Sequence, residues 1–283
     1  MTPEDLETAY DQARWAANMQ EVLTRHGLMS ERARQAIGDS TRIAYGAANE
    51  EKLDIYKARG TNAPIVVFIH GGGWQRGSAK DHSFPAEMLL AENIHFIAMD
   101  FSSVADTDGD LSILVDQIRR GIFWIYQNAS SFGGDANKLY LVGHSSGAHL
   151  AAMTLSTRWA DYELQNNPIK GGFIVSGIYD LAPLRKTSRS NHIKLNDKSE
   201  HTLSPIRQVA QISCSISMWV GSKESPEFDR QSREYASVAR AAGKDVKLAV
   251  GDTYNHFDIL DTLGNPYGLL GRDLIRFVGT GHL

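Results

Sequence analysis

The sequence predicts an α/β protein in which a mostly parallel sheet is covered by helices on both faces. Three observations lead to this prediction. Short runs of bulky, uncharged residues recur along the chain, as expected for strands that are buried on both faces of a sheet. Segments with apolar residues at helical spacing separate these runs, which is the order found in βαβ proteins. The length of 283 residues suits one large domain better than two small ones.

The individual elements follow from these patterns. Buried strands are expected at 65–69, 94–99, 139–142, 172–176, 215–220 and 246–250. Two segments that alternate apolar with polar residues predict an edge hairpin, at 42–45 and 53–58. Helices are expected at 83–91, 113–126, from 146 onward, at 228–242 and at 269–278.

Two segments lie outside this alternation. Residues 1–37 are expected to be a helical arm, interrupted at Gly27, and the sequence leaves open whether it covers the site, an oligomer surface or only the core. Residues 180–205 are polar and broken by proline and asparagine. Because so long a loop inside a compact domain is usually functional, we expect a small cap over the site. The chain is therefore expected to be a single domain, 1–283, for which a homodimer is left open.

Composition narrows the classes of partner. The formal net charge is −4, and no cluster of lysine and arginine stands out, which argues against a nucleic-acid partner. No apolar stretch approaches the roughly 18 residues of a membrane span. The single cysteine, Cys214, excludes an internal disulfide and fits a reducing compartment. The acidic first residues lack the apolar segment of a signal peptide, so a cytoplasmic location is expected.

The pattern G-x-S-x-G occurs at 143–147, directly after an apolar run and directly before a helical one. In that context the serine occupies a sharp strand-to-helix turn, where flanking glycines let neighbouring backbone approach. Free N–H groups and the positive end of the helix dipole there favour a developing oxyanion. Ser145 is therefore the candidate nucleophile, against the alternative that the string arises by chance.

A run of three glycines follows the strand at 65–69, in the segment His70–Trp74. Successive glycines let N–H groups turn toward a ligand. The expected oxyanion-hole donors are the amides of Gly72, Gly73 and Ser146, the alternative being a merely flexible turn. Trp74 is expected beside this hole, either as a wall for the substrate or as part of the core.

The remaining partners should follow in the order acid, then histidine. His256 lies in the loop after the last expected strand and is the candidate base. Glu224 follows the strand at 215–220, at the sheet edge where α/β sites collect, and is the candidate acid. Glu227 is the alternative, although it could instead cap the next helix.

Five segments together resemble one family. They are HGGGW (70–74), GHSSGAHL (143–150), SGIYDLAPL (176–184), ESPEF (224–228) and NHFDIL (255–260). The set resembles the kynurenine formamidase-like branch of the α/β-hydrolases, which neighbours the hormone-sensitive-lipase-type esterases. The resemblance implies an α/β-hydrolase fold and a hydrolase that needs no metal or other cofactor and releases a short acyl group from an aromatic amine. It also implies that Ser145, Glu224 and His256 form the catalytic triad, with Gly72, Gly73 and Ser146 at the oxyanion hole.

Two positions depart from the family pattern. Formamidases commonly have aspartate where this chain has Glu224, and the animal enzymes often have tyrosine where Gly73 stands. Glutamate at the acid position resembles the bacterial N-acylanthranilate amidases. A smaller residue at 73 leaves room for an acyl group larger than formyl.

The resemblance predicts an aromatic amide as substrate. Its ring would need stacking surfaces, for which the motifs offer Trp74, Phe101 and Tyr179. A substrate carboxylate would need a cation, which Arg76 or a cap residue could provide: Arg189, His192 or Lys194. Two other functions remain open, a broad carboxylesterase that uses the same triad on short acyl esters and a non-catalytic binding protein. The last usually lacks a triad member, whereas all three candidates are present here.

Overall fold

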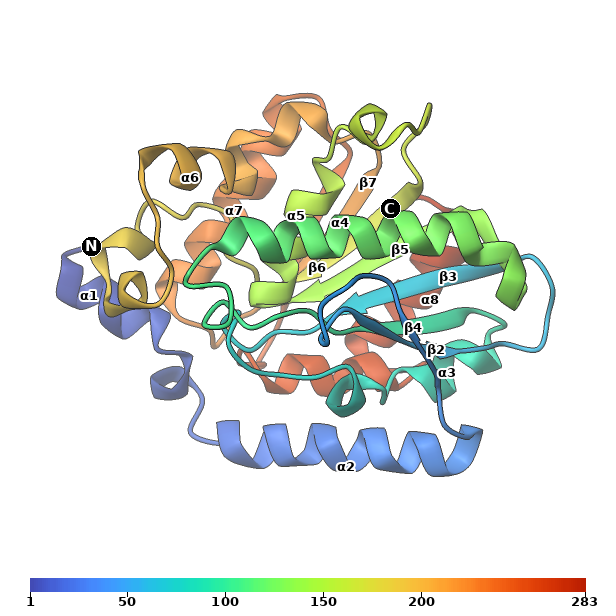
Figure 1. Ribbon diagram of the computed structural model, residues 1–283. Coiled ribbons are helices and arrows are strands. Elements are labelled where there is room, and N and C mark those ends of the chain that lie inside the picture. Colours follow the sequence, from blue (N-terminus) through green and yellow to red (C-terminus); the bar gives the residue numbers. More distant parts are fainter.

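The computed structural model describes residues 1–283 and has an eight-stranded sheet at its centre (Figure 1). Its strands are β1 (Thr41–Ala44), β2 (Lys52–Tyr56), β3 (Ala63–Ile69), β4 (His95–Met99), β5 (Gly134–His144), β6 (Ile169–Val175), β7 (Ser215–Gly221) and β8 (Val246–Gly251). The order across the sheet is β1-β2-β4-β3-β5-β6-β7-β8. Strands β3 to β8 pair in parallel, whereas β1 and β2 form an antiparallel hairpin at one edge. The predicted mostly parallel sheet is confirmed.

Helices cover both faces of this sheet (Figure 1). They are α1 (Pro3–Tyr10), α2 (Met19–Ile37), α3 (Ala86–Ala91), α4 (Leu111–Asn128), α5 (Ser146–Leu155), α6 (Asp197–Thr202), α7 (Pro226–Ala241) and α8 (Leu269–Thr280). One face packs against α4, α5 and α7, and the other packs against α3 and α8. None of these helices combines the length and the apolar character that crossing a membrane requires.

Strand β3 shows why the buried strands carry no charge. Ile65, Val67 and Ile69 point into the core on the side of α4 and α5. Val66 and Phe68 alternate with them and point to the opposite core. All five are almost inaccessible to solvent, and each such side chain contributes about 1.5–3 kcal/mol of transfer free energy. A strand between two helical layers therefore needs apolar residues on both faces.

The N-terminal arm (residues 1–37) differs from the prediction at Gly27. Helix α2 continues unbroken through this residue and ends at Gly38, which adopts a φ of 90°. A Cβ placed on Gly27 would meet no atom within 4 Å, so nothing at this position forces a break. Glycine costs about 1 kcal/mol relative to alanine in a helix, which the packing of α2 outweighs. The predicted interruption at Gly27 was wrong.

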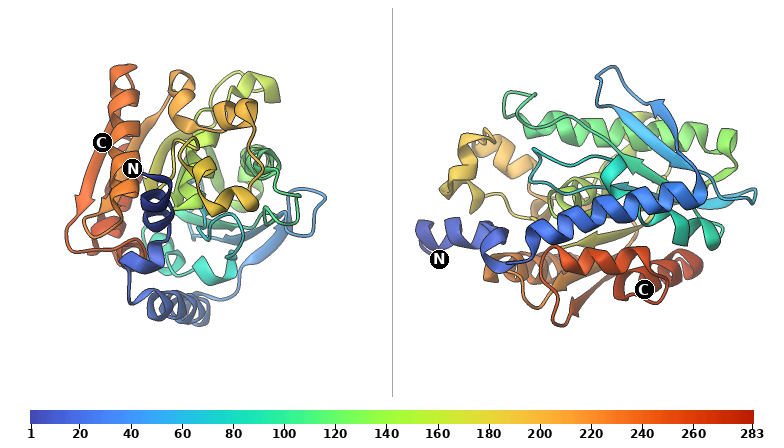
Figure 2. Two further views of the ribbon diagram at one scale, coloured as in Figure 1. Left: turned by 90° about the vertical axis from the view of Figure 1, so that its left-hand side faces the viewer. Right: turned by 90° about the horizontal axis from the view of Figure 1, so that it is seen from below.

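The arm and the cap (residues 180–205) meet at the end of the molecule toward which the parallel strands point. Figure 2 shows α1 beside the cap segment when the molecule is seen from that end. The cap consists of short 3-10 turns followed by α6. The Ser188 backbone N–H and hydroxyl both donate to the Glu7 carboxylate, at 2.7 and 2.5 Å. This contact fixes the start of one cap turn to α1.

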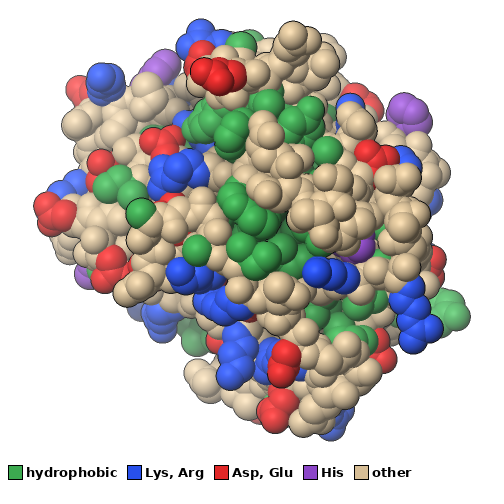
Figure 3. Space-filling model, turned by 45° about the vertical axis from the view of Figure 1, so that its right-hand side comes forward, with side chains coloured by type: hydrophobic (Ala, Val, Ile, Leu, Met, Phe, Trp, Pro, Cys, Tyr) green, Lys and Arg blue, Asp and Glu red, His purple; other side chains and the backbone are tan.

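The surface carries charges of both signs. On the face shown in Figure 3, acidic and basic side chains are interspersed, and apolar side chains show in the hollows between them.

Several buried histidines, among them His149 and His70, make the fold sensitive to acid. His149 is fully buried in α5, where its Nδ1 accepts the Trp74 indole N–H (3.3 Å) and its Nε2–H donates to the Leu203 carbonyl (2.8 Å). The neutral ring is thus satisfied at both nitrogens, and a second ring proton would face the indole N–H. His70, at the end of β3, is also buried. Burial lowers the pKa of each of these histidines to about 4.

We expect stability to fall between pH 6.5 and about 4. Because the unfolded chain binds these two protons near pH 6.5 while the folded protein binds them only near pH 4, the free energy of unfolding decreases across this window. Urea denaturation at pH 7.0 and pH 5.0 measures the loss. In His149→Gln the glutamine can reproduce both hydrogen bonds without titrating, so the free energy of unfolding should fall less between pH 7.0 and pH 5.0 than in the wild type. Equal stability of the wild type at both pH values would contradict this assignment.

Candidate active site

Three candidate side chains meet at the carboxyl ends of neighbouring strands. Ser145 stands between β5 and α5 with φ 56° and ψ −123°, a strained conformation for a residue other than glycine. Glu224 follows β7, and His256 follows β8. Since the carboxyl ends of parallel strands lie at one edge of the sheet, loops far apart in sequence converge there.

These side chains form a continuous line of hydrogen bonds. The Ser145 hydroxyl lies 2.8 Å from His256 Nε2, and His256 Nδ1 lies 2.7 Å from Glu224 Oε2. The carboxylate can only accept, so Nδ1 carries the proton and Nε2 is free to accept from the hydroxyl. Glu227 does not reach the histidine, because its buried carboxylate accepts from the Tyr10 hydroxyl and pairs with Arg230. Of the two acidic candidates, the structure brings Glu224 to His256.

The orientation of Glu224 is fixed by its other oxygen. Oε1 accepts the Ser176 hydroxyl at 2.5 Å and the Gly221 backbone N–H at 2.7 Å. The whole Glu224 side chain is inaccessible to solvent. A buried carboxylate is stable only when donors surround it, and here three donors hold it so that Oε2 faces the histidine. The sequence prediction missed Ser176, although it lies in one of the family-like segments.

A turn beside Ser145 carries free donors. Gly72 and Gly73 adopt φ values of 117° and 65°, which favour glycine. The backbone N–H groups of Gly72, Gly73 and Ser146 donate to no acceptor within the protein. A Cβ placed on Gly71 would lie 3.0 Å from the Ser145 Cβ, which shows how closely this turn approaches the serine. The turn of the predicted donors therefore approaches the serine, and the donors have no competing bond.

The structure contradicts two predicted substrate contacts. Trp74 is 1% exposed, with its ring edge-on to His149, and Tyr179 is 0% exposed, stacked on Tyr235. Neither ring has surface left for a substrate, so both expected substrate contacts were wrong, and Trp74 takes the core position that the sequence left as its alternative. Arg76, by contrast, is exposed on the same turn as Gly72 and stays a predicted contact.

The N-terminal arm borders the site, a point that the sequence left open. Gln12 Nε2 donates to the hydroxyl of Ser225, the residue after Glu224, at 2.9 Å. Asn18 Oδ1 accepts from Asn255 Nδ2, next to His256, at 2.8 Å. The arm therefore supports the loops that carry both the candidate acid and the candidate base.

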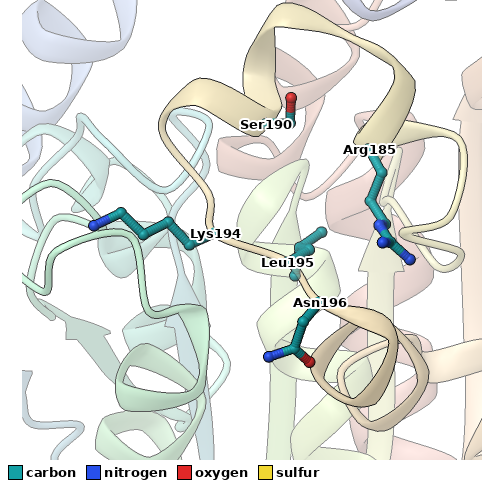
Figure 4. A pocket seen from close by; sticks show the side chains of 5 residues that line it. All are labelled: Arg185, Ser190, Lys194, Leu195 and Asn196. Carbon is teal, nitrogen blue, oxygen red and sulfur yellow. The ribbon is translucent and has the colours of Figure 1, made fainter.

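A cavity of about 410 Å³ opens in the cap (Figure 4). It is lined by Arg185, Ser190, Lys194, Leu195 and Asn196. The two cations point away from each other, and each is already paired, Arg185 with Asp197 at 2.7 Å and Lys194 with Asp108 at 2.6 Å. This cavity thus offers no free cation to an anionic ligand. No three histidine, cysteine, aspartate or glutamate side chains are placed to hold a metal ion.

Comparison with known proteins places the chain in a family. Residues 53–217 match the BD-FAE family. The kynurenine formamidase of Danio rerio is 36% identical over 99% of this chain and 97% of its own length, and that of Salmo salar is 32% identical over the same shares.

The chain belongs to the kynurenine formamidase family of α/β-hydrolases. The same fold occurs in EstE1, a thermophilic carboxylesterase from a metagenomic library, with a TM-score of 0.75, 14% identity and coverage of 95% of this chain and 98% of EstE1. As a member of the kynurenine formamidase family, the protein is a hydrolase that acts on an amide or ester bond.

We expect Ser176→Ala to lower kcat for p-nitrophenyl acetate about 3- to 10-fold. The change removes one donor from the buried Glu224 carboxylate, worth about 1.5–3 kcal/mol for a bond to a charged group, and part of that loss appears in the orientation of His256. Ser232→Ala is the matched control, because the Ser232 hydroxyl is buried without a partner. Equal kcat values for the two variants would refute a role for Ser176 at the site.

Proposed function

We propose that this protein is a serine hydrolase that cleaves the amide bond of N-acyl arylamines through an acyl-enzyme. The observation that carries the proposal is the line of hydrogen bonds from Ser145 through His256 to Glu224, beside backbone donors without partners. The kynurenine formamidases that resemble the chain over almost its full length support the amide class.

In the first step Ser145 attacks the amide carbonyl carbon. Its hydroxyl proton passes to His256 Nε2, 2.8 Å away, as the Oγ–C bond forms. The resulting imidazolium is stabilised by the buried Glu224 carboxylate at Nδ1. The oxyanion is held by backbone N–H groups of Gly72, Gly73 and Ser146, which are already fixed in place and need no reorganisation.

In the second step the carbon–nitrogen bond breaks. His256 returns its proton from Nε2 to the leaving nitrogen, so the arylamine departs neutral and Ser145 keeps the acyl group. Water, deprotonated by His256, then releases the acid and restores the serine. An anilide is easier to cleave than an alkyl amide, because the ring delocalises the nitrogen lone pair. A site built like that of an esterase can therefore perform this reaction.

The substrates we propose are of the N-formylkynurenine or N-acylanthranilate type, met in the cytoplasm. The resemblance to formamidases favours the first, and the departures at Glu224 and Gly73 favour the second. The arm and the exposed cap are candidate surfaces for a homodimer.

A substrate panel tests this function. We expect wild-type protein to hydrolyse N-formylkynurenine, N-acetylanthranilate or a longer N-acylanthranilate, and Ser145→Ala to lose at least about a thousandfold in kcat. If all three amides are inert while p-nitrophenyl acetate turns over through Ser145, the protein is a carboxylesterase. If a fluorophosphonate probe fails to label Ser145 as well, the protein is a binding protein and the catalytic proposal is wrong.

Variants of Glu224 and Glu227 test which glutamate is the acid of the proposed triad, independently of the substrate. We expect Glu224→Gln to lower kcat about a thousandfold or more, because an amide neither enforces the Nδ1–H tautomer nor stabilises the imidazolium. Glu224→Asp keeps the charge but withdraws it by one methylene, so a smaller loss is expected. Glu227→Gln should change the free energy of unfolding while leaving kcat close to wild type. A larger kcat loss in Glu227→Gln than in Glu224→Gln would reverse the assignment.

A further inference from the structure

Arg189 lies between the N-terminal arm and the turn that carries the oxyanion donors. Its Nη2 donates to the backbone carbonyl of Tyr10 at 2.7 Å. Its Nη1 lies 3.4 Å from the position that a Cβ on Gly73 would occupy. The guanidinium of this cap residue therefore stands directly beside the oxyanion hole.

This cation has no anionic partner. Its only side-chain hydrogen bond is the one to the neutral carbonyl of Tyr10, while the nearby Glu7 carboxylate is taken by Ser188. Burial lowers the pKa of Arg189, and this effect outweighs the nearby Tyr10, Asp11 and Glu7, whose negative charges raise it. A partly desolvated charge without a hydrogen-bonded counter-charge is costly, so an anion that enters the site gains a charge-assisted hydrogen bond.

Other cations of the cap are paired with carboxylates, unlike Arg189. Arg185 pairs with Asp197, and Lys194 pairs with Asp108, although both cations lie farther toward solvent than Arg189. The cap cation nearest the hole is thus left without the partner that its exposed neighbours have. An arginine also presents five donors in a planar fork, and only one of them is used by Tyr10.

Building on the proposed amidase function, we propose that Arg189 binds the carboxylate of the arylamine leaving group. The substrate class is then an N-acyl arylamine that bears a carboxylate, on the ring as in anthranilate or on a ring substituent as in kynurenine. The carboxylate docks on the free edge of the guanidinium, and this fixes the scissile carbonyl relative to Gly73. Arg189 is in this sense a specificity-determining residue.

The N-terminal arm positions this residue. Tyr10 is 1% exposed, its hydroxyl bonds to Glu227 and its ring packs edge-on against Phe228 of α7. The carbonyl that holds Arg189 is therefore anchored to the body of the domain. An arginine held at one nitrogen loses less entropy when it binds a ligand with the others.

The test is the binding of arylamines with and without a carboxylate. Isothermal titration calorimetry of anthranilate against aniline, and of 4-(2-aminophenyl)-4-oxobutanoate, the kynurenine skeleton without its α-ammonium group, against 2-aminoacetophenone, gives a carboxylate preference for each ring type without needing turnover. We expect wild type to prefer at least one acid by about 10- to 100-fold, the range for a charge-assisted pair. Arg189→Gln should lose this preference, whereas its affinity for the neutral amines should change less than about threefold.

Two further variants separate binding from a structural role. Arg189→Lys keeps the charge and a donor for the Tyr10 carbonyl but lacks the fork, so an intermediate preference is expected. Arg185→Gln, in the same cap but already paired, should keep the wild-type preference. If Arg189→Gln and Arg189→Lys both retain the full preference, or weaken acids and neutral amines equally, Arg189 only joins the cap to the arm and the proposal is wrong. Absence of any preference in wild type overturns it as well.

The outcomes also separate this inference from the proposed function. In turnover, the preference of wild type for N-formylanthranilate over formanilide should also be lost in Arg189→Gln. The loss should appear in KM more than in kcat. If wild type binds the acids through Arg189 but hydrolyses no amide, the amidase function fails and the carboxylate site remains. If wild type hydrolyses both amides with no dependence on Arg189, the function remains and the carboxylate site fails.

Discussion

The close approach of two backbone turns, one after β3 and one after β5, is the constraint on which the site depends. A Cβ on Gly147 would lie 2.1 Å from the Ile69 carbonyl oxygen, and one on Gly143 would lie 2.5 Å from the Gly147 carbonyl oxygen. No side chain fits in these positions. The glycines around Ser145 are therefore a packing requirement that brings the donor turn to the nucleophile. Displacing either turn by about 1 Å would carry the N–H groups out of the hydrogen-bond range.

The buried Glu224 charge is the second element that the surrounding structure must accommodate. Its three donors come from His256, Ser176 and Gly221, on three separate loops or strand ends. Polar networks of this kind are favourable only when every member is satisfied. The N-terminal arm helps to keep this network in place, because Gln12 and Asn18 hydrogen-bond to Ser225 and Asn255, the neighbours of Glu224 and His256. The arm is thus part of the framework that orders the candidate acid and base, although none of its side chains hydrogen-bonds to Ser145, His256 or Glu224.

The sequence was sufficient to predict those elements whose pattern lies within one short segment of the chain. The uncharged run of β3 identified a strand buried on both faces, and the motifs located the loops of Ser145 and His256. Local patterns do not reveal which way a side chain turns. Trp74 packs its ring inward, edge-on to His149, so its place next to the glycines did not make it a substrate wall. Arg189 and Tyr10 are 179 positions apart, and their contact exists only because the arm and the cap meet at one end of the fold.

All the proposed oxyanion donors are backbone groups, so they would hold any acyl carbonyl alike and cannot choose among substrates. Discrimination must come from groups that touch the rest of the substrate, and the buried rings of Trp74 and Tyr179 are unavailable for this. The cap and the arm remain, with Arg189 as the charged group beside the hole. A carboxylate bound there would convert binding energy far from the scissile bond into orientation of the carbonyl over Ser145. An amide needs that orientation more than an activated ester does, because its nitrogen must also receive the proton of His256 as it leaves.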